Sequence, residues 1–261
     1  MENLIFDSHA HYDDHAFDED RDVVLSGLKE NGVGYVVDIC AAMDDMEKIL
    51  KLTRKYDFMY SAAGLHPSEL VELNDENLSA IREMLADPKC RAVGEIGLDY
   101  HYDLSPRDAQ REVFDRQMDM AFDLGVPVQL HIREAHGDCL DMLRARAKAR
   151  RMPAGIMHCF GYSKEMARQF LDLGYYIALG GVVTFKNARR PVEVVQTVPL
   201  EHLFVETDSP YMAPVPFRGQ TNTPVHVEEV AKKFAQIKDL TLEEVAETTF
   251  RNACGFYGIT Y

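Results

Sequence analysis

The sequence predicts an α/β fold in which eight short apolar strands alternate with amphipathic helices and close into a (β/α)8 barrel. Three observations support this: strand and helix patterns alternate along the whole chain, glycine often follows a helix pattern, and 261 residues suit one such barrel. Gly32, Gly125 and Gly174 each stand just after a predicted helix, the position where glycine commonly caps a helix C-terminus. No low-complexity linker interrupts the sequence, so residues 1–261 are predicted to form a single domain. A doubly wound open sheet is the second choice.

The predicted strands are short runs of apolar or β-branched residues: Leu4–Asp7, Tyr35–Ile39, Met59–Ala63, Ala92–Glu95, Pro127–His131, Gly155–His158, Tyr176–Leu179 and Leu203–Glu206. Helical periodicity predicts Asp20–Asn31, Asp44–Tyr56, Glu76–Ala86, Arg107–Leu124, Cys139–Arg150 and Lys164–Leu173 between them, and Val225–Ile237 and Leu242–Phe256 after the last strand. Repeated strand-then-helix order requires parallel pairing through right-handed crossovers.

Charge and cysteine content narrow the class of protein. The chain has 28 Lys and Arg against 43 Asp and Glu, a net charge of -15. A protein with this negative charge repels nucleic acid at long range. A phosphate-bearing substrate must therefore be bound locally, by metal ions and a few basic side chains. Five cysteines without a Cys-x-x-Cys pair indicate reduced thiols. Without a secretory leader or a membrane-length apolar run, we expect a cytoplasmic protein with no membrane partner and no obligate protein partner.

Metal-ligating side chains stand at or just after five of the predicted strands. They are His9, His11, Glu95, His131, His158 and Asp208. In the His-x-His pair, both imidazoles share one face because side chains two residues apart in a strand point the same way. The C-terminal ends of barrel strands share one rim, where active sites lie. The sequence therefore predicts that these side chains converge.

Four imidazoles and two carboxylates are enough for two divalent cations. One allocation gives His9, His11 and Asp208 to one cation and His131 and His158 to the other, with Glu95 bridging. Such a pair would convert a water molecule into a hydroxide nucleophile, with Asp208 as general base. The mixed donor set suits zinc or manganese as readily as magnesium.

Two further side chains are predicted to contact an anionic substrate. His66 follows the third predicted strand, and Arg218 lies in the loop that follows Asp208. The densest basic run, from Arg144 to Arg151, has a different interpretation. It ends a predicted helix, where cations suit the macrodipole, and we expect it to form a solvated face rather than a nucleic-acid site.

Taken together, these motifs resemble the TatD family of metal-dependent deoxyribonucleases, a branch of the amidohydrolase superfamily. The resemblance extends over essentially the whole chain and includes the segments 6–11, 64–67, 94–100, 158–160 and 206–211. It implies a TIM barrel and a two-metal site made of the six ligands given above. In this family a glutamate bridges the metals, and Glu95 fits that place. The resemblance also implies phosphodiester hydrolysis, often removal of nucleotides from the 3′ end of single-stranded DNA, usually with magnesium.

Two alternatives stay open at this stage. A hydrolase of the same architecture could act on the carbonyl carbon of an ester, a lactone or an aminoacyl-tRNA, because the ligand set does not distinguish carbon from phosphorus. Arg218 and His66 favour an anionic substrate, such as DNA ends or short oligonucleotides. A metal-binding or scaffold protein without turnover is the other alternative, and the presence of Asp208 and of all other ligands argues against it.

Overall fold

The computed structural model describes residues 4–69, 74–102 and 104–261. The strands are β1 (Ile5–Ala10), β2 (Val33–Cys40), β3 (Met59–Ala63), β4 (Cys90–Asp99), β5 (Val128–Arg133), β6 (Gly155–Met157), β7 (Tyr176–Leu179) and β8 (Leu203–Val205). The α-helices are α1 (Arg21–Ser26), α2 (Met46–Lys55), α3 (Asp75–Met84), α4 (Arg107–Leu124), α5 (His136–Ala149), α6 (Lys164–Asp172), α7 (Arg189–Thr197), α8 (Val227–Lys238) and α9 (Leu242–Tyr257).

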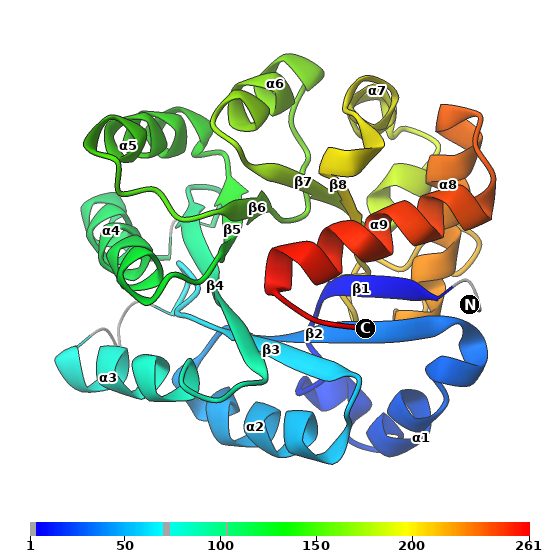
Figure 1. The fold of residues 1–261 in the computed structure, drawn as a ribbon, viewed down its shortest axis with the longest axis horizontal. Coiled ribbons are helices and arrows are strands. Elements are labelled where there is room, and N and C mark those ends of the chain that lie inside the picture. Colours follow the sequence, from blue (N-terminus) through cyan, green and yellow to red (C-terminus); the bar gives the residue numbers. More distant parts are fainter. Residues whose placement is uncertain (1–3, 70–73, 103) are drawn as a thin grey trace. The chain divides into compact units, whose positions relative to one another are not determined.

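The strands form one sheet in which sequence neighbours are also hydrogen-bonded neighbours, from β1 to β8 (Figure 1). The pairs whose register is known, such as β4 with β5, are parallel. A helix separates each strand from the next one along the chain. Strands in sequence order with intervening helices are the arrangement of the (β/α)8 barrel, and the predicted fold class is confirmed.

Several element boundaries differ from the sequence prediction. Strand β4 continues four residues beyond Glu95, so Glu95 lies inside the strand rather than at its end. The predicted helix Asp20–Asn31 is the short α1 followed by a separate 3-10 turn, Lys29–Asn31. Helix α7 lies between β7 and β8, where no helix was predicted. Apolar periodicity locates buried faces well, but it does not fix where a strand stops when buried polar residues continue it.

The chain divides into two compact units. Unit 1 comprises Met1–Asp38, Cys159–Leu171 and Tyr176–Tyr261; unit 2 comprises Ile39–His158 and Asp172–Tyr175. The prediction of a single domain over residues 1–261 stays a prediction. All five cysteines are free, and four of them are buried. Within the described ranges, no helix combines the length and the apolar character needed to cross a membrane.

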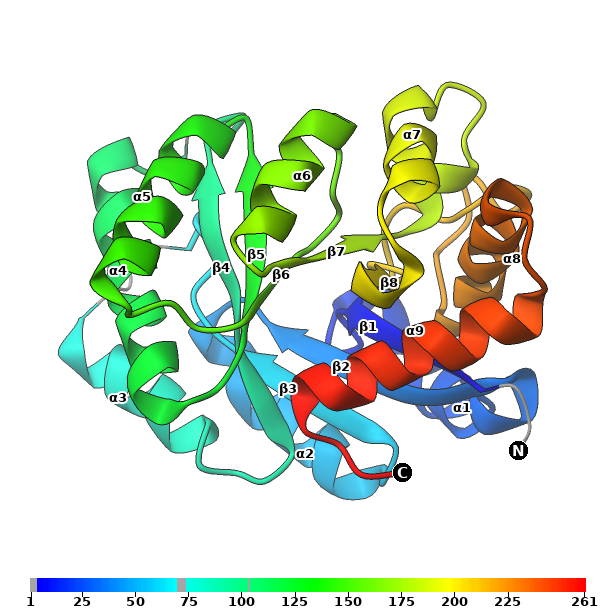
Figure 2. The ribbon, with the colours of Figure 1, turned by 45° about the horizontal axis from the view of Figure 1, so that its top comes forward.

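In unit 1, the C-terminal helices complete the core around β1. Helix α9 runs beside β1 and β8 (Figure 2). The ring of Phe6 packs between two rings of α9, with centroid distances of 6.0 Å to Phe250 and 5.7 Å to Tyr257. The Tyr257 hydroxyl also donates to the Ser8 carbonyl at 3.2 Å. Strand β8 lies against β1, because the Ser8 hydroxyl donates to the Val205 carbonyl at 3.0 Å.

In unit 2, helix α4 holds the ends of two strands through buried glutamines. Helix α4 lies along β4 and α5 along β5 (Figure 2). The amide of Gln117 accepts from the backbone N–H of Leu65 at 2.7 Å and donates to its carbonyl at 3.1 Å. Gln110 makes the same pair of bonds with Asp99, at 2.8 and 3.0 Å. Both pairs satisfy backbone groups where strands end.

The basic run at the end of α5 is only partly the solvated face that was expected. Its other basic residues are exposed, but Arg146 is 7% exposed. The Arg146 guanidinium donates to the Asp115 carboxylate at 2.6 and 2.9 Å and to Asp119 on α4 at 3.1 Å. The prediction was therefore wrong for Arg146, whose aliphatic stem is buried while its head group is paired.

Candidate functional site

Three of the predicted ligands converge in unit 1. His9 lies in β1, His11 follows the end of that strand, and Asp208 follows β8. The Asp208 Oδ1 atom lies 3.6 Å from His11 Nε2 and 3.9 Å from His9 Nε2. Ligands bound tetrahedrally at about 2.1 Å from a cation lie roughly 3.4 Å from one another. The two distances from Asp208 are close to this spacing, and the three side chains each offer a ligand atom within 4.8 Å of the others, so the trio could surround a divalent cation.

The backbone holds Asp208 beside β1. Its N–H donates to the His9 carbonyl at 2.9 Å, and the His11 N–H donates to the Ser209 carbonyl at 2.7 Å. The φ angle of Asp208 is +58°, in the left-handed region that few non-glycine residues adopt. Aspartate tolerates this region better than most residues. The turn directs the carboxylate toward the imidazoles at a conformational cost that the neighbouring bonds offset.

A buried hydrogen-bond network lies behind these ligands. The Asp7 carboxylate accepts from the Thr207 N–H at 2.8 Å, the Thr207 hydroxyl at 2.6 Å and the Tyr12 hydroxyl at 2.8 Å. Thr207 Oγ1 in turn accepts from the Ser209 N–H at 3.1 Å. Burial raises the pKa of Asp7 to about 7, although its hydrogen bonds oppose that shift. Asp7 thus connects β1 to the peptide before Asp208.

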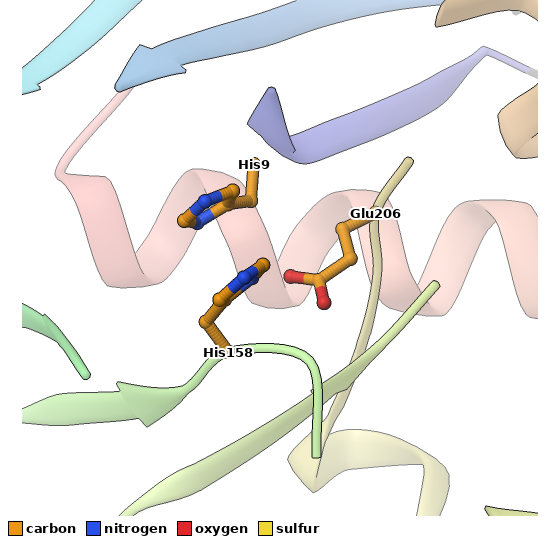
Figure 3. Close-up of side chains that lie close together, drawn as sticks. All are labelled: His9, His158 and Glu206. Carbon is orange, nitrogen blue, oxygen red and sulfur yellow. The ribbon is translucent and has the colours of Figure 1, made fainter. Parts of the chain in front are cut away.

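Glu206 is a carboxylate that the sequence reasoning did not identify. It is fully buried, and its Oε1 accepts from the Cys159 N–H at 2.7 Å. A carboxylate oxygen of Glu206 and a ring nitrogen of His9 lie within 4.8 Å of each other. Figure 3 shows both side chains, with His158, the residue before Cys159. Glu206 precedes Asp208 by two residues, the same spacing as His9 and His11, and that spacing could have revealed it. Together, His9, His11, Glu206 and Asp208 form what we term the β1–β8 group.

In unit 2, three imidazoles face a single carboxylate oxygen. Glu95 Oε1 lies 2.7 Å from His131 Nδ1, 3.7 Å from His158 Nε2 and 3.8 Å from His66 Nε2. The His66 and His131 rings meet edge to face at 4.4 Å between centroids. We term these residues the Glu95 group. It contains the predicted ligands Glu95, His131 and His158, and it also contains His66, which was expected to contact substrate.

A second carboxylate that was not predicted, Asp99, contacts the Glu95 group. Its Oδ2 lies 3.1 Å from His131 Nε2. Burial alone would raise the pKa of Asp99, but the bond with His131 lowers it to about 2. Burial disfavours the charged His131 ring, yet bonds to Asp99 and Glu95 raise its pKa to about 9. Glu95 and Asp99 are four residues apart in β4, so their side chains share a face, a signal present in the sequence.

Gly97 explains how β4 approaches β5 closely enough for these contacts. It has a φ of +151°, and a Cβ at this position would lie 1.9 Å from the His131 carbonyl oxygen. The register between β4 and β5 shifts between Val93 and Ile96, on either side of Glu95. A glycine is therefore required here, because any side chain would separate the strand that carries Glu95 from the strand that carries His131.

The remaining predicted site residue, Arg218, belongs to neither donor group. Its guanidinium lies over the Phe185 ring at 3.8 Å, and the residue is exposed. Both groups offer imidazole nitrogens and carboxylate oxygens, the donors that zinc, manganese and related divalent cations accept. The residues present therefore fit the expected metal ions. Their number and identity stay predictions.

The chain matches the family model described as "TatD related DNase" over residues 6–258. It is 39% identical over 250 residues to the metal-dependent hydrolase YabD of Bacillus subtilis, covering 96% of this chain and 97% of that protein. It is 34% identical over 259 residues to the metal-dependent hydrolase YcfH of Escherichia coli K12, covering 98% and 96%. The crystal structure of YjjV, a TatD homologue from the same organism, superposes with a TM-score of 0.92 at 29% identity, covering all of both chains.

Proposed function

This chain belongs to the family of TatD-related DNases, which are metal-dependent hydrolases, and on that premise we propose that it is a deoxyribonuclease. The proposed reaction is phosphodiester hydrolysis at the 3′ end of single-stranded DNA, an ester-bond cleavage, by a cytoplasmic enzyme. The observation that carries the proposal is the trio of His9, His11 and Asp208, whose donor atoms have the spacing of metal ligands. The description of the family as DNases supports DNA as the class of substrate.

We assign one divalent cation to each donor group. His9, His11 and Asp208 would hold one, and Glu95, His131 and His158 would hold the other. That Glu95 also bridges to the first cation stays a prediction. Divalent cations in such sites supply Lewis acidity and make a water molecule acidic enough to serve as a nucleophile near neutral pH.

Asp208 is the proposed general base. Asp208 is largely buried, and the bond from its N–H to the His9 carbonyl holds its backbone beside β1. From this position its carboxylate would accept a proton from the attacking water. Asp7 and Thr207 hold the peptide that precedes Asp208. Arg218, stacked on Phe185, is proposed to bind a phosphate of the strand, since stacking leaves its in-plane N–H donors available.

The test is digestion of a 3′-end-labelled single-stranded oligonucleotide by purified protein, with and without chelator. The proposal expects stepwise loss of nucleotides that stops when the metal is removed and returns with added magnesium or manganese. An aryl ester, a lactone and a mischarged tRNA are offered in parallel. Cleavage of one of these with the oligonucleotide left intact would instead establish the carbonyl hydrolase.

A further inference from the structure

An exposed apolar ledge follows β8 in unit 1. Tyr211 is 51% exposed, Met212 39% and Val215 42%, all within five residues. Large apolar side chains that are exposed together mark binding surfaces more often than isolated ones do. The ledge begins three residues after Asp208, so its position in the chain links it to the β1–β8 group.

The ring of Tyr211 is fixed although it is exposed. Its N–H donates to the Asp208 carbonyl at 2.8 Å, its carbonyl accepts from the Asn222 side chain at 2.8 Å, and its hydroxyl donates to Asp14 at 2.7 Å. The hydroxyl is already committed to a carboxylate, so the exposed ring face is what Tyr211 offers to a ligand. A fixed aromatic ring binds at a low cost in conformational entropy.

The same ring adjoins a predicted metal ligand. The centroids of Tyr211 and His11 are 6.1 Å apart, with the rings at 65° to each other. A planar group stacked on Tyr211 would therefore belong to the part of the substrate next to the reacting phosphate. A nucleobase is such a group, and base-on-aromatic stacking is how proteins bind single strands without reading their sequence.

The loop that carries Tyr211 also carries a cation suited to the neighbouring phosphate. Arg218 lies in the same loop, whose far end returns to its beginning because the Asn222 N–H donates to the Pro210 carbonyl at 2.9 Å. Asn222 is fully buried, and its side chain also donates to the Thr207 carbonyl at 2.9 Å. The Tyr211 ring and the Arg218 guanidinium are thus held on one closed loop. The net charge of the chain is -15, which repels nucleic acid, so this cation is well placed to bind a phosphate locally.

We propose that Tyr211 is a stacking platform for a nucleobase of the substrate strand, beside the phosphodiester that is cleaved. This inference rests on the proposed function, because it assigns a subsite for the same substrate. If Tyr211 stacks a base, single-stranded ends are the preferred substrate, since a base paired in a duplex presents no free face to the ring. The same stacking also predicts tolerance of base identity, because every nucleobase has a face that can stack.

The first test measures binding without turnover. Oligonucleotides carrying 2-aminopurine at the terminal or the penultimate 3′ position are mixed with protein in chelator. Stacking on the wild-type ring is expected to quench the fluorescence at one of these positions. Tyr211→Ala should abolish this quenching, and Tyr211→Phe should retain it because the ring remains. Tyr261→Ala is the matched control: Tyr261 is 59% exposed and packs on Phe250 of α9 at 5.1 Å.

The second test measures turnover on strands that have a base, or an abasic residue, at each of those two positions. Tyr211→Ala should lower kcat/KM by about tenfold to a hundredfold on base-bearing strands, the range for loss of one stacked base. On the strand that lacks the stacked base, Tyr211→Ala and wild type should be equal. The stacking proposal would be overturned if Tyr211→Ala lowered kcat/KM equally on all strands, or if it lowered kcat/KM on none of them. If wild-type protein cleaves none of them, the proposed function itself fails.

Discussion

The two donor groups differ in how their facing atoms are spaced, and the difference indicates which is better arranged for a cation. In the β1–β8 group, Asp208 lies 3.6 and 3.9 Å from its two imidazoles, beyond hydrogen-bond length. In the Glu95 group, His131 is hydrogen-bonded to Glu95 at 2.7 Å. A cation entering the first group meets ligands already at coordination spacing. A cation entering the second must first replace a bond between two of its ligands.

The largest effect expected in this comparison is on turnover, through Asp208. Asp208→Asn keeps the shape of the side chain but removes the proposed general base, so kcat should fall by roughly a thousandfold or more. Asp239→Asn is the matched control, because Asp239 is an exposed aspartate with a similar φ of +55°. The measurement is digestion of the labelled strand, with circular dichroism to show that both variants fold. Near-full activity of Asp208→Asn would remove the base assignment.

The next effect concerns the metal affinities of the two donor groups. Breaking a hydrogen bond that involves a charged group costs about 1.5–3 kcal/mol. We therefore expect the Glu95 group to bind its cation about tenfold to a hundredfold more weakly than the β1–β8 group binds its own. A calorimetric titration of metal-free protein with manganese should give two separate affinities for the metal.

Single substitutions assign those affinities to the groups. His11→Ala should remove the tighter one and Glu95→Gln the weaker one. Two equal affinities, or loss of the tighter one in Glu95→Gln, would contradict the comparison of spacings.

A smaller effect is expected from the network behind the β1–β8 group. Thr207→Val removes the hydroxyl that donates to the buried Asp7 carboxylate at 2.6 Å, which should lower the free energy of unfolding by about 1–3 kcal/mol. It should also weaken manganese binding by about tenfold or more, because groups behind a ligand orient it. Thr249→Val is the control: its hydroxyl donates within α9, to the carbonyls of Val245 and Ala246. Equal metal affinity in both variants would make the network structural alone.

The fold could be predicted from the sequence, and donor side chains could be proposed from it, because both depend on short-range patterns. Alternating strands and helices predict the sheet order, and His-x-His predicts two imidazoles on one face of β1. Glu206 and Asp99 were missed although the same alternation relates them to Asp208 and Glu95. Asp99 lies four residues beyond the predicted end of its strand, because β4 extends to Asp99, and Gly97 gives no sign of how closely β5 approaches. Glu206 ends the predicted strand Leu203–Glu206, and nothing in the pattern of that strand alone separates it from a strand-end carboxylate without a role in the site.

Other features depend on tertiary packing that no local pattern carries. Arg146 belongs to a basic run that resembles a solvated helix end, and only the position of α4 places Asp115 and Asp119 beside it. The substrate contact predicted for His66 stays a prediction; its ring lies edge to face against that of His131, a contact that the sequence pattern does not indicate. The positions of such side chains are set by neighbours that are distant in the sequence.

The smallest effect is expected from Arg218, which lies outside both donor groups. Arg218→Ala should raise KM for a single-stranded oligonucleotide several-fold and leave kcat almost unchanged, since a phosphate contact acts in the ground state and the transition state alike. Arg189→Ala is the control: this exposed residue pairs with Glu193 along α7 at 2.9 Å. If KM in Arg218→Ala equals that of wild type, the contact with Phe185 is structural.

The central claim is that two sets of side chains hold divalent cations, and anomalous diffraction from manganese-soaked crystals tests it most directly. We expect one manganese peak bound by His9, His11 and Asp208 and another bound by Glu95, His131 and His158, at bond lengths of about 2.0–2.3 Å. Manganese peaks at other residues, or no manganese peak anywhere on the protein at saturating manganese, would contradict the account.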